Sequence, residues 1–307
     1  MKAEHKPPYI FNSVAELNQA LGLPKPLHPL IALNDYKNIT ADTTELSKGM
    51  ITNLYKISYK KHFSGKIKYG QQYYDFDEGG LCFISPNQIV SNIEPALDYE
   101  GFSLMFHPDF IRNYPLGKSI KNYGFFSYTA SEALHPSEKE KETIIRIFKS
   151  IQEELELPID QYSQDVIVSQ IELLLNYSNR YYNRQFITRK AVNHDLLSQL
   201  EDLLENYFDS EKSLLSGLPS VQQIADDLNV SPRYLSDMLR VLTGQNAQQH
   251  IHNKLIEKAK DILSSTNLTI AEIAYQLGFE HPQSFNKLFK RKTNVSPLEF
   301  RQSFHGN

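Results

Sequence analysis

An internal repeat in the last third of the chain constrains the fold more than any other sequence feature. Residues 220–245 align with residues 269–295, and Ile224-Ala225 matches Ile273-Ala274 at an offset of 49 residues. Later in the alignment the offset becomes 50, so the second copy has one extra residue in its turn. Self-similarity of this kind indicates one supersecondary unit that occurs twice.

Both copies begin with the same helix-start signature. Ser220 is followed three residues later by Gln223, and Thr269 by Glu272. In such a capping box the side chain of each residue satisfies a free backbone N–H of the other. Each copy is therefore predicted to begin a helix at this point.

A turn and a second helix follow in each copy. Asn229 and Gly278 come at the end of the first helical pattern, and both residue types tolerate the left-handed backbone that ends a helix. Pro232 and Pro282 then stand at the first turn of a second helix, where a missing N–H costs nothing. The pattern predicts a helix-turn-helix in each copy. A single such unit could equally be a plain three-helix packing module.

One long helix is predicted between the copies, over residues 247–263. Its apolar residues fall on one stripe: Ile251, Leu255, Ile256, Ala259, Ile262 and Leu263. A rigid connecting helix would fix the distance between the two second helices, and a DNA duplex presents its major groove again after about 34 Å. Two matched units with this spacer favour one chain that contacts two successive major-groove segments.

The run EIAYQLGFEHPQSFNKLFKRKTNVSPLEFR resembles the second helix-turn-helix of the arabinose-regulator (AraC/XylS) family. The resemblance covers residues 195–303 and includes Leu-Gly-Phe, Phe-Lys and the closing Ser-Pro-x-x-Phe-Arg. Asn294 departs from it, because the family most often has Gly there, but Asn accepts the same left-handed conformation. The resemblance implies a sequence-specific DNA-binding transcription regulator.

Base contacts are implied on the exposed N-terminal face of each second helix. The implied residues are Arg233, Ser236 and Asp237 in the first copy, and Gln283, Asn286 and Lys287 in the second. Gln or Asn can bond adenine bidentately, and Arg or Lys can bond guanine. Asp237 would repel phosphate, so it either accepts from a cytosine amine or orients Arg233 or Arg240.

Phosphate contacts are expected from Arg240, Lys290, Arg291 and Lys292, which would position the protein without reading sequence. The alternative for each is a solvated helix face. The whole chain has a net charge of −4, but from Ser231 onward ten bases stand against six acids, which gives a net charge of +4. The basic end of the chain fits a nucleic-acid partner.

The first half of the chain is predicted to be rich in β-strands. Alternating patterns cover residues 51–59, 66–76, 81–85 and 101–107, and helical patterns follow at 137–157 and 165–182. The predicted fold is α+β with two domains. The resemblance implies that residues 1–183 form a cupin-like effector and dimerisation domain, residues 184–194 a linker, and residues 195–307 the double helix-turn-helix domain.

The cupin-like part of the resemblance implies a β-barrel whose mouth can hold a small effector. The candidate lining residues are aromatic: Tyr55, Tyr59, Tyr69, Tyr73 and Phe83. Packing in the core is the alternative for all of them. A regulator whose N-terminal domain only dimerises is therefore a second hypothesis.

A cupin enzyme is the third hypothesis, and the sequence gives it little support. His62 has no second His two residues later, and His107 precedes Pro108 in a predicted turn, whereas a metal needs three or four convergent ligands. No nucleophile elbow, phosphate loop or dinucleotide fingerprint occurs. We therefore expect no catalytic residues, no metal and no cofactor.

Localisation and partners complete the expectations. Cys82 is the only cysteine, and the sequence has neither a signal-peptide pattern nor a membrane-length apolar run. We expect a cytoplasmic homodimer that binds double-stranded DNA and no membrane. A small-molecule effector and RNA polymerase are further candidate partners.

Overall fold

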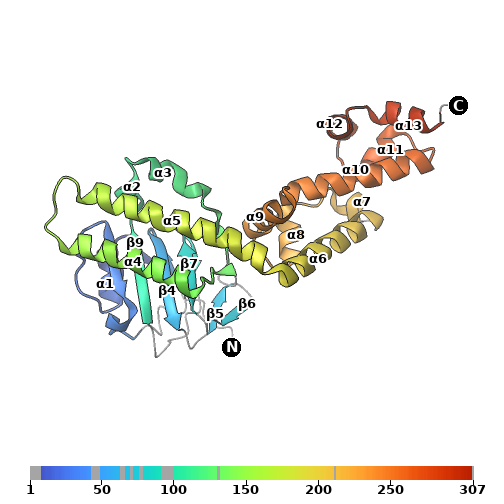
Figure 1. The fold of residues 1–307 in the computed structure, drawn as a ribbon. Coiled ribbons are helices and arrows are strands. Elements are labelled where there is room, and N and C mark those ends of the chain that lie inside the picture. The colour runs from blue at the N-terminus through green and yellow to red at the C-terminus, as the bar shows by residue number, and fades with distance from the viewer. Residues whose placement is uncertain are drawn as a thin grey trace. The chain divides into compact units, whose positions relative to one another are not determined.

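The chain divides into two units, Met1–Gln185 and Phe186–Asn307, in a computed structural model of the protein (Figure 1). The structure describes residues 8–42, 49–62, 66–69, 72–75, 79–90, 100–129, 132–210 and 212–305. The division falls inside the segment predicted as a linker. That segment is helical except at Arg189, because it contains neither Gly nor Pro: α5 (Ser163–Thr188) runs directly into α6 (Lys190–Asp209).

The N-terminal unit is built on an antiparallel four-stranded sheet. Its strands, in spatial order, are β2 (Ile31–Asp35), β9 (Glu100–Phe106), β4 (Tyr55–His62) and β7 (Gly80–Ile84). A second sheet pairs β1 (Tyr9–Phe11), β3 (Met50–Thr52) and β8 (Ile89–Val90). A third is the hairpin of β5 (Lys66–Tyr69) and β6 (Gln72–Asp75).

The prediction of a mixed α+β fold is confirmed, but the expected barrel does not close within the described residues. The strands there form three separate sheets, and β2 and β7 are the edges of the largest. Two predicted strands were also too long. The pattern at 51–59 divides at Asn53 and Leu54 into strands of different sheets, and the pattern at 66–76 is a hairpin.

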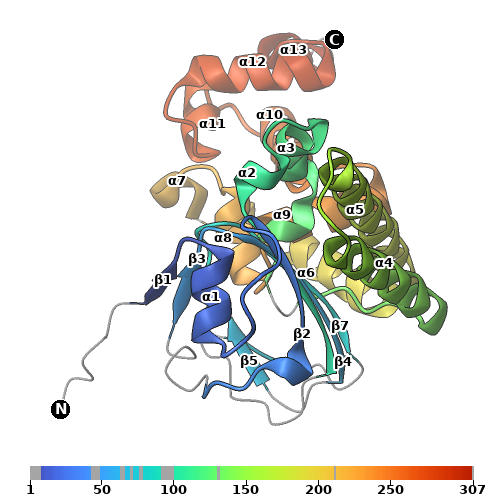
Figure 2. The same ribbon diagram turned by 90° about the vertical axis from the view of Figure 1, so that its left-hand side faces the viewer.

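Helices cover one face of the four-stranded sheet. Along the sequence, β9 is followed by α2 (Pro108–Ile111), α3 (Pro115–Ser119) and the short helical turns Ile120–Asn122 and Gly124–Ser127. Then α4 (Glu138–Glu156) and α5 run along the sheet (Figure 2). Phe102 of β9 stacks on Phe148 of α4 at 5.7 Å, and Phe83 of β7 lies 6.3 Å from Tyr182 of α5, between ring centroids.

The opposite face of that sheet packs on the second sheet and on α1 (Val14–Ala20). A single helical turn, Tyr36–Asn38, follows β2. A buried apolar cluster joins these layers: Phe11, Val14, Leu17, Ala32, Met50, Leu54, Ile84, Val90 and Met105. Both faces of the sheet are therefore covered.

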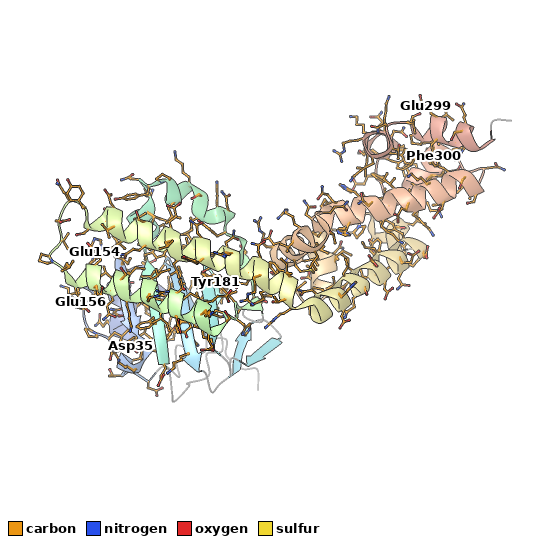
Figure 3. All side chains as sticks on the ribbon, viewed as in Figure 1. Asp35, Glu154, Glu156, Tyr181, Glu299 and Phe300 are labelled. Atoms are coloured by element: carbon orange, nitrogen blue, oxygen red, sulfur yellow. The ribbon has the colours of Figure 1, made fainter. Side chains whose placement is uncertain are left out.

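The described part of the C-terminal unit is entirely helical. After α6 its elements are α7 (Lys212–Ser216), α8 (Val221–Asp227), α9 (Pro232–Thr243), α10 (Ala247–Ser265), α11 (Ile270–Gln276), α12 (Pro282–Thr293) and α13 (Pro297–His305). The predicted stripe of α10 is buried along its whole length. Phe300 of α13, labelled in Figure 3, packs edge-on against Phe289 of α12 at 5.6 Å and lies beneath the amine of Lys260 on α10.

Both predicted capping boxes are confirmed. The Ser220 hydroxyl accepts from the Gln223 N–H at 3.1 Å, and the Gln223 side chain accepts from the Ser220 N–H at 2.9 Å. The Thr269 and Glu272 pair makes the same two bonds at 3.2 and 2.7 Å. None of the described helices is both long enough and apolar enough to cross a bilayer.

Gly278 should be the least replaceable residue of the C-terminal unit. Its φ is +92°, and a Cβ there would lie 2.6 Å from the carbonyl carbon of Gly217 and 2.7 Å from the carbonyl oxygen of Ser213. We expect Gly278→Ala to lower the free energy of unfolding by about 3 kcal/mol or more, from strain and overlap together. Urea denaturation monitored by circular dichroism measures this loss in the free energy of unfolding.

Gly244→Ala is the matched control, because Gly244 has φ +77° but no atom within 4 Å of the added Cβ. Gly244→Ala should lower the free energy of unfolding by about 1–2 kcal/mol, because only the left-handed backbone is strained. Equal losses in the two variants would contradict the close approach of Gly278 to the backbone of Gly217 and Ser213.

The second capping box should make the stability of the C-terminal unit depend on pH. The Thr269 N–H, and then its hydroxyl, hold the pKa of Glu272 below its ordinary value. A lowered pKa in the folded state means that the stabilisation is present at neutral pH and is lost as the pH falls through that lowered pKa. Melting temperature measured against pH should show this loss, and Glu272→Gln should remove it.

The first copy provides the reciprocal control, since Gln223 does not titrate there. Gln223→Glu should introduce a similar acid-dependent loss at the start of α8. Identical pH profiles for the wild type and Glu272→Gln would show that this carboxylate contributes nothing through its bonds to Thr269.

Candidate functional site

Each repeat makes the predicted tight turn between two helices. In the first, Asn229 adopts φ +57° and the Val230 N–H donates to the Ala225 carbonyl at 2.9 Å. In the second, Gly278 takes the equivalent place and the Phe279 N–H donates to the Ala274 carbonyl at 2.9 Å. Left-handed backbone at both turns reverses the chain without leaving these groups unpaired.

Small and large side chains together fill the angle between the two helices of each unit. Ala225 and Ala274 are fully buried at the crossing points. Leu235 and Leu239 close the first unit, and the second unit has a chain of aromatic contacts through Phe279, Phe285 and Phe289. Asn294 ends α12 with φ +65°, where Gly244 ends α9 with φ +77°, so the left-handed prediction for Asn294 is confirmed.

The surface of α12 is polar and basic. The predicted base-contacting residues Gln283, Asn286 and Lys287 are all exposed. The predicted phosphate-contacting residues Lys290, Arg291 and Lys292 are exposed in the last turns. The helix carries four bases and no acid, so its field is uniformly positive.

The surface of α9 is different, because an acid lies between its two arginines. Asp237 accepts from Nε of Arg233 at 2.9 Å and from the guanidinium of Arg240 at 2.7 Å. The Asp237 side chain is 17% exposed, and Ser236 beside it is half-buried. Of the alternatives for Asp237, the orienting contact is present, and with both arginines at once.

The sequence analysis missed a chain of side chains that connects the two repeats. Nζ of Lys292 on α12 donates to the Asn253 amide oxygen at 3.0 Å. The Asn253 amide nitrogen on α10 donates in turn to the Gln245 side chain at 2.7 Å, just after α9. No motif marks Asn253, because its importance comes only from the way that α10 packs between the units.

The candidate effector residues of the N-terminal unit lie mainly in packed surroundings. Tyr59 and Phe83 are 2% and 3% exposed on the face covered by α4 and α5, and Tyr55 stacks on Phe106 at 5.3 Å. The side chains of Tyr69 and Tyr73 lie outside the described residues. Their role in a pocket stays a prediction.

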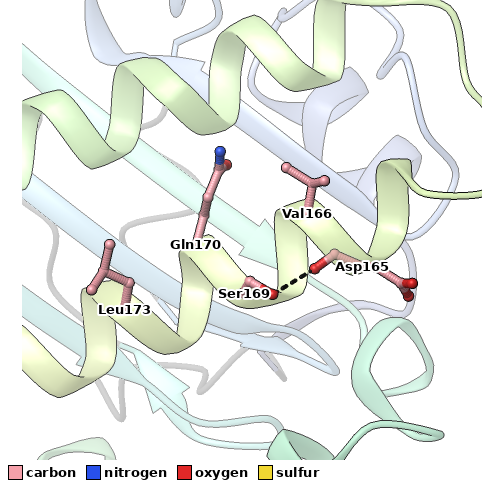
Figure 4. A pocket seen from close by; sticks show the side chains of 5 residues that line it. All are labelled: Asp165, Val166, Ser169, Gln170 and Leu173. Carbon is pink, nitrogen blue, oxygen red and sulfur yellow. Dashed lines mark hydrogen bonds between the residues drawn. The ribbon is translucent and has the colours of Figure 1, made fainter.

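Two of the surface hollows lie among the described residues of the N-terminal unit. One, of about 180 Å³, lies between β2 and the end of α4. The other, of about 360 Å³, lies on α5 beside Asp165, Val166, Ser169, Gln170 and Leu173 (Figure 4). No group of three or more His, Cys, Asp and Glu side chains in the described part of the chain is arranged to hold a metal ion.

Comparison with known proteins identifies the C-terminal unit. Residues 224–303 match the family described as a helix-turn-helix domain. The transcriptional activator RhaS of Escherichia coli is 28% identical over 155 residues, which are 50% of this chain and 51% of RhaS, so the chain spans about half the length of this relative. The transcriptional regulator YfiF of Bacillus subtilis is 24% identical over 255 residues, which are 82% of this chain and 78% of YfiF.

Among solved structures, the C-terminal domain of the response regulator yesN from Fusobacterium nucleatum is 31% identical. The match covers 33% of this chain and 96% of that domain, with a TM-score of 0.29. RhaS is described as a transcriptional activator and YfiF as a transcriptional regulator. Residues 224–303 therefore have the sequence of a helix-turn-helix domain, and the relatives that share this part of the chain are transcriptional regulators.

Proposed function

We propose that the chain is a sequence-specific DNA-binding transcription regulator in which α9 and α12 each enter a major groove. The observation that carries the proposal is the presence of two complete helix-turn-helix units, joined by α10, within one compact unit. In such a unit the N-terminal face of the second helix meets base edges.

In the second unit, Gln283, Asn286 and Lys287 read bases. Their exposure and polarity suit this role, since Gln and Asn match adenine and Lys matches guanine. Lys290, Arg291 and Lys292 contact phosphates and fix the register of α12 on the duplex.

In the first unit, Arg233 reads a base and Arg240 contacts a phosphate, with Ser236 at the edge of the contact. Asp237 holds both guanidinium groups in place before DNA arrives, which reduces the side-chain entropy lost on binding. Its own charge opposes phosphate, so it favours one geometry over general affinity.

The N-terminal unit, on this proposal, is a cupin-like sensing and dimerising domain in the cytoplasm. Tyr162, Val166 and Leu173 are exposed apolar side chains on α5 and the turn before it, and Val166 and Leu173 line the hollow in Figure 4. A second copy of the chain would cover such a surface. Effector binding would then shift the balance between two presentations of the readers to DNA and RNA polymerase.

Selection of the full-length chain on random duplexes tests DNA reading. We expect a site with two short conserved blocks about one helical turn, or 34 Å, apart. Gln283→Ala should cost about 1–3 kcal/mol and relax the preference within one block only. Gln302→Ala, an exposed position on α13, is the matched control and should leave the site unchanged.

A salt titration separates the phosphate contacts from the base contacts. Lys290→Ala should weaken binding to all sequences equally and reduce the slope of log affinity against log salt by about 0.9. Weak, salt-independent binding with no enriched site would overturn the proposed function and make the repeat a structural module.

Replacing Asp237 tests its role between the arginines. Asp237→Asn should raise affinity for random DNA and steepen the salt slope by about 0.9 for each arginine that gains a phosphate, while sequence preference falls. Asp261→Asn makes the same charge change on an exposed part of α10 and should have little effect. An unchanged preference in Asp237→Asn would contradict the orienting role.

A further inference from the structure

The hollow of about 180 Å³ beside β2 follows an open edge of the four-stranded sheet. All five residues of β2, Ile31–Asp35, line it, so it extends along about 13 Å of strand. Successive residues of a strand point to opposite faces, so a hollow that touches all of them runs beside the backbone and not over one face. Within the described residues, β9 is the only strand that pairs with β2.

The hollow has two walls, one from α4 and one from α1 and the segment after it. Leu33 and Asp35 share the face of Phe102, which packs on α4. The lining residues of this α4 wall are Gln152, Leu155 and Glu156. Ala32 and Asn34 face the other way, toward α1. The lining residues of this α1 wall are Asn18 and residues 23–27.

The peptide groups of Leu33 point into the hollow. The His107 N–H donates to the Leu30 carbonyl at 2.8 Å, which makes these two residues a hydrogen-bonded pair of the antiparallel ladder. Such pairs alternate, so Ala32 and Asn34 bond to β9, while the N–H and C=O of Leu33 point away from it. No group in the described part of the chain bonds to them. An edge of this kind can pair with another extended chain.

The open stretch of this edge is short, because both of its ends are closed. At the start of the strand, His28 forms a bridge to Ile31. At its end, Asp35 accepts from the Lys37 N–H at 3.1 Å and forms an ion pair with the Lys37 amine at 2.8 Å. Pockets for whole small-molecule ligands measure about 300–1,000 Å³, so this hollow suits a side chain and a stretch of backbone better.

The α4 wall favours a positively charged side chain. The last turn of α4 carries Glu153, Glu154 and Glu156 and no base, and the carbonyl end of a helix is itself partly negative. Glu156, labelled in Figure 3, accepts from the Gln152 side chain at 2.9 Å but has no cationic partner among the described residues. The one base that lines the hollow, Lys25, is exposed and belongs to the other wall.

We infer that the edge of β2 binds a short extended peptide, which adds to the sheet as a strand and places a lysine or arginine side chain beside Glu156. The peptide residue opposite Leu33 exchanges two backbone hydrogen bonds with it, and directly opposite residues share a face of the sheet. The apolar stem of that peptide residue therefore covers Leu155, and its charged end reaches Glu156. Its two neighbours in the peptide point to the α1 wall, where Asn18 favours small polar side chains.

This peptide site goes beyond the proposed function and does not depend on it. In strand addition the main-chain bonds supply affinity, and the alternate side chains supply specificity. The backbone of Leu33 and the carboxylate of Glu156 can therefore be tested separately.

Binding of synthetic peptides to the full-length chain, measured by isothermal titration calorimetry, tests the backbone bonds. The probe is acetyl-Val-Thr-Lys-Thr-Val-amide. Methylation of the central lysine's backbone nitrogen removes the donor to the Leu33 carbonyl and should weaken binding about tenfold or more. Methylation of the backbone nitrogen of either threonine is the matched control, because that nitrogen faces away from β2, and should leave binding unchanged.

Variants of the chain test the same two groups from the protein side. Leu33→Pro removes only an outward N–H, which an edge strand tolerates, and should weaken binding about tenfold, whereas Leu33→Ala keeps the N–H and should weaken it less. Glu156→Gln should abolish the preference for this probe over the same peptide with glutamate in place of lysine. Glu153→Gln, an exposed position outside the hollow, is the control and should keep that preference.

Four outcomes would overturn the inference: no binding of the probe, equal losses from methylated lysine and methylated threonine, equal binding by Leu33→Pro and Leu33→Ala, or a dimer that Leu33→Pro abolishes in ultracentrifugation. The last would assign the edge to a second copy of the chain. If Leu33→Pro does not fold, the methylated probes on the wild type decide.

DNA selection on the same preparation separates the peptide site from the proposed function. A selected DNA site without peptide binding would remove this inference alone. Peptide binding without a selected DNA site would remove the proposed function and leave the peptide site.

Discussion

The arrangement of the C-terminal unit depends on the buried stripe of α10. This 19-residue helix is about 28 Å long, and its apolar residues are covered by elements of both repeats. Each repeat alone has two short helices, which are too small to enclose a core. Because α10 supplies the missing wall to both, neither α9 nor α12 can turn independently, and the spacing between them is a property of one packed core rather than of a flexible connection.

Within that common core the two repeats differ in their electrostatics. The arginines of α9 are neutralised in part by Asp237, whereas α12 carries only positive charge. The charged side chains of α9 are therefore already held in place but attract a polyanion weakly. Those of α12 attract a polyanion more strongly but are less constrained. On the proposed function, α12 would contribute more to encounter and α9 more to discrimination.

The helical half of the molecule could be predicted closely because its signals are local. Capping boxes, left-handed Asn or Gly and helix-opening Pro each act within a few residues, and even the substitution of Asn294 for Gly behaved as expected. The contact of Lys292 with Asn253 could not be predicted, since it joins residues 39 apart and depends on packing.

The sheet half was harder for a physical reason. Side chains on a strand alternate between faces, so the aromatic residues chosen as pocket candidates, Tyr55, Tyr59 and Phe83, share one face, and Lys56, Ser58 and Lys60 share the other. Both faces of this sheet are covered, and the sequence does not indicate which face packs against helices and which packs against the second sheet. The missing closure of the barrel depends likewise on pairing between distant strands.

The bond between Lys292 and Asn253 has a consequence for communication between the repeats. A lysine amine that turns toward a phosphate must leave the Asn253 oxygen, and Asn253 also holds Gln245 behind the first unit. On the proposed function, occupation of the second half-site would then loosen a side chain just after α9. The two half-sites would be coupled through a single asparagine, and α10 would set the strength of that coupling by how firmly it holds Asn253.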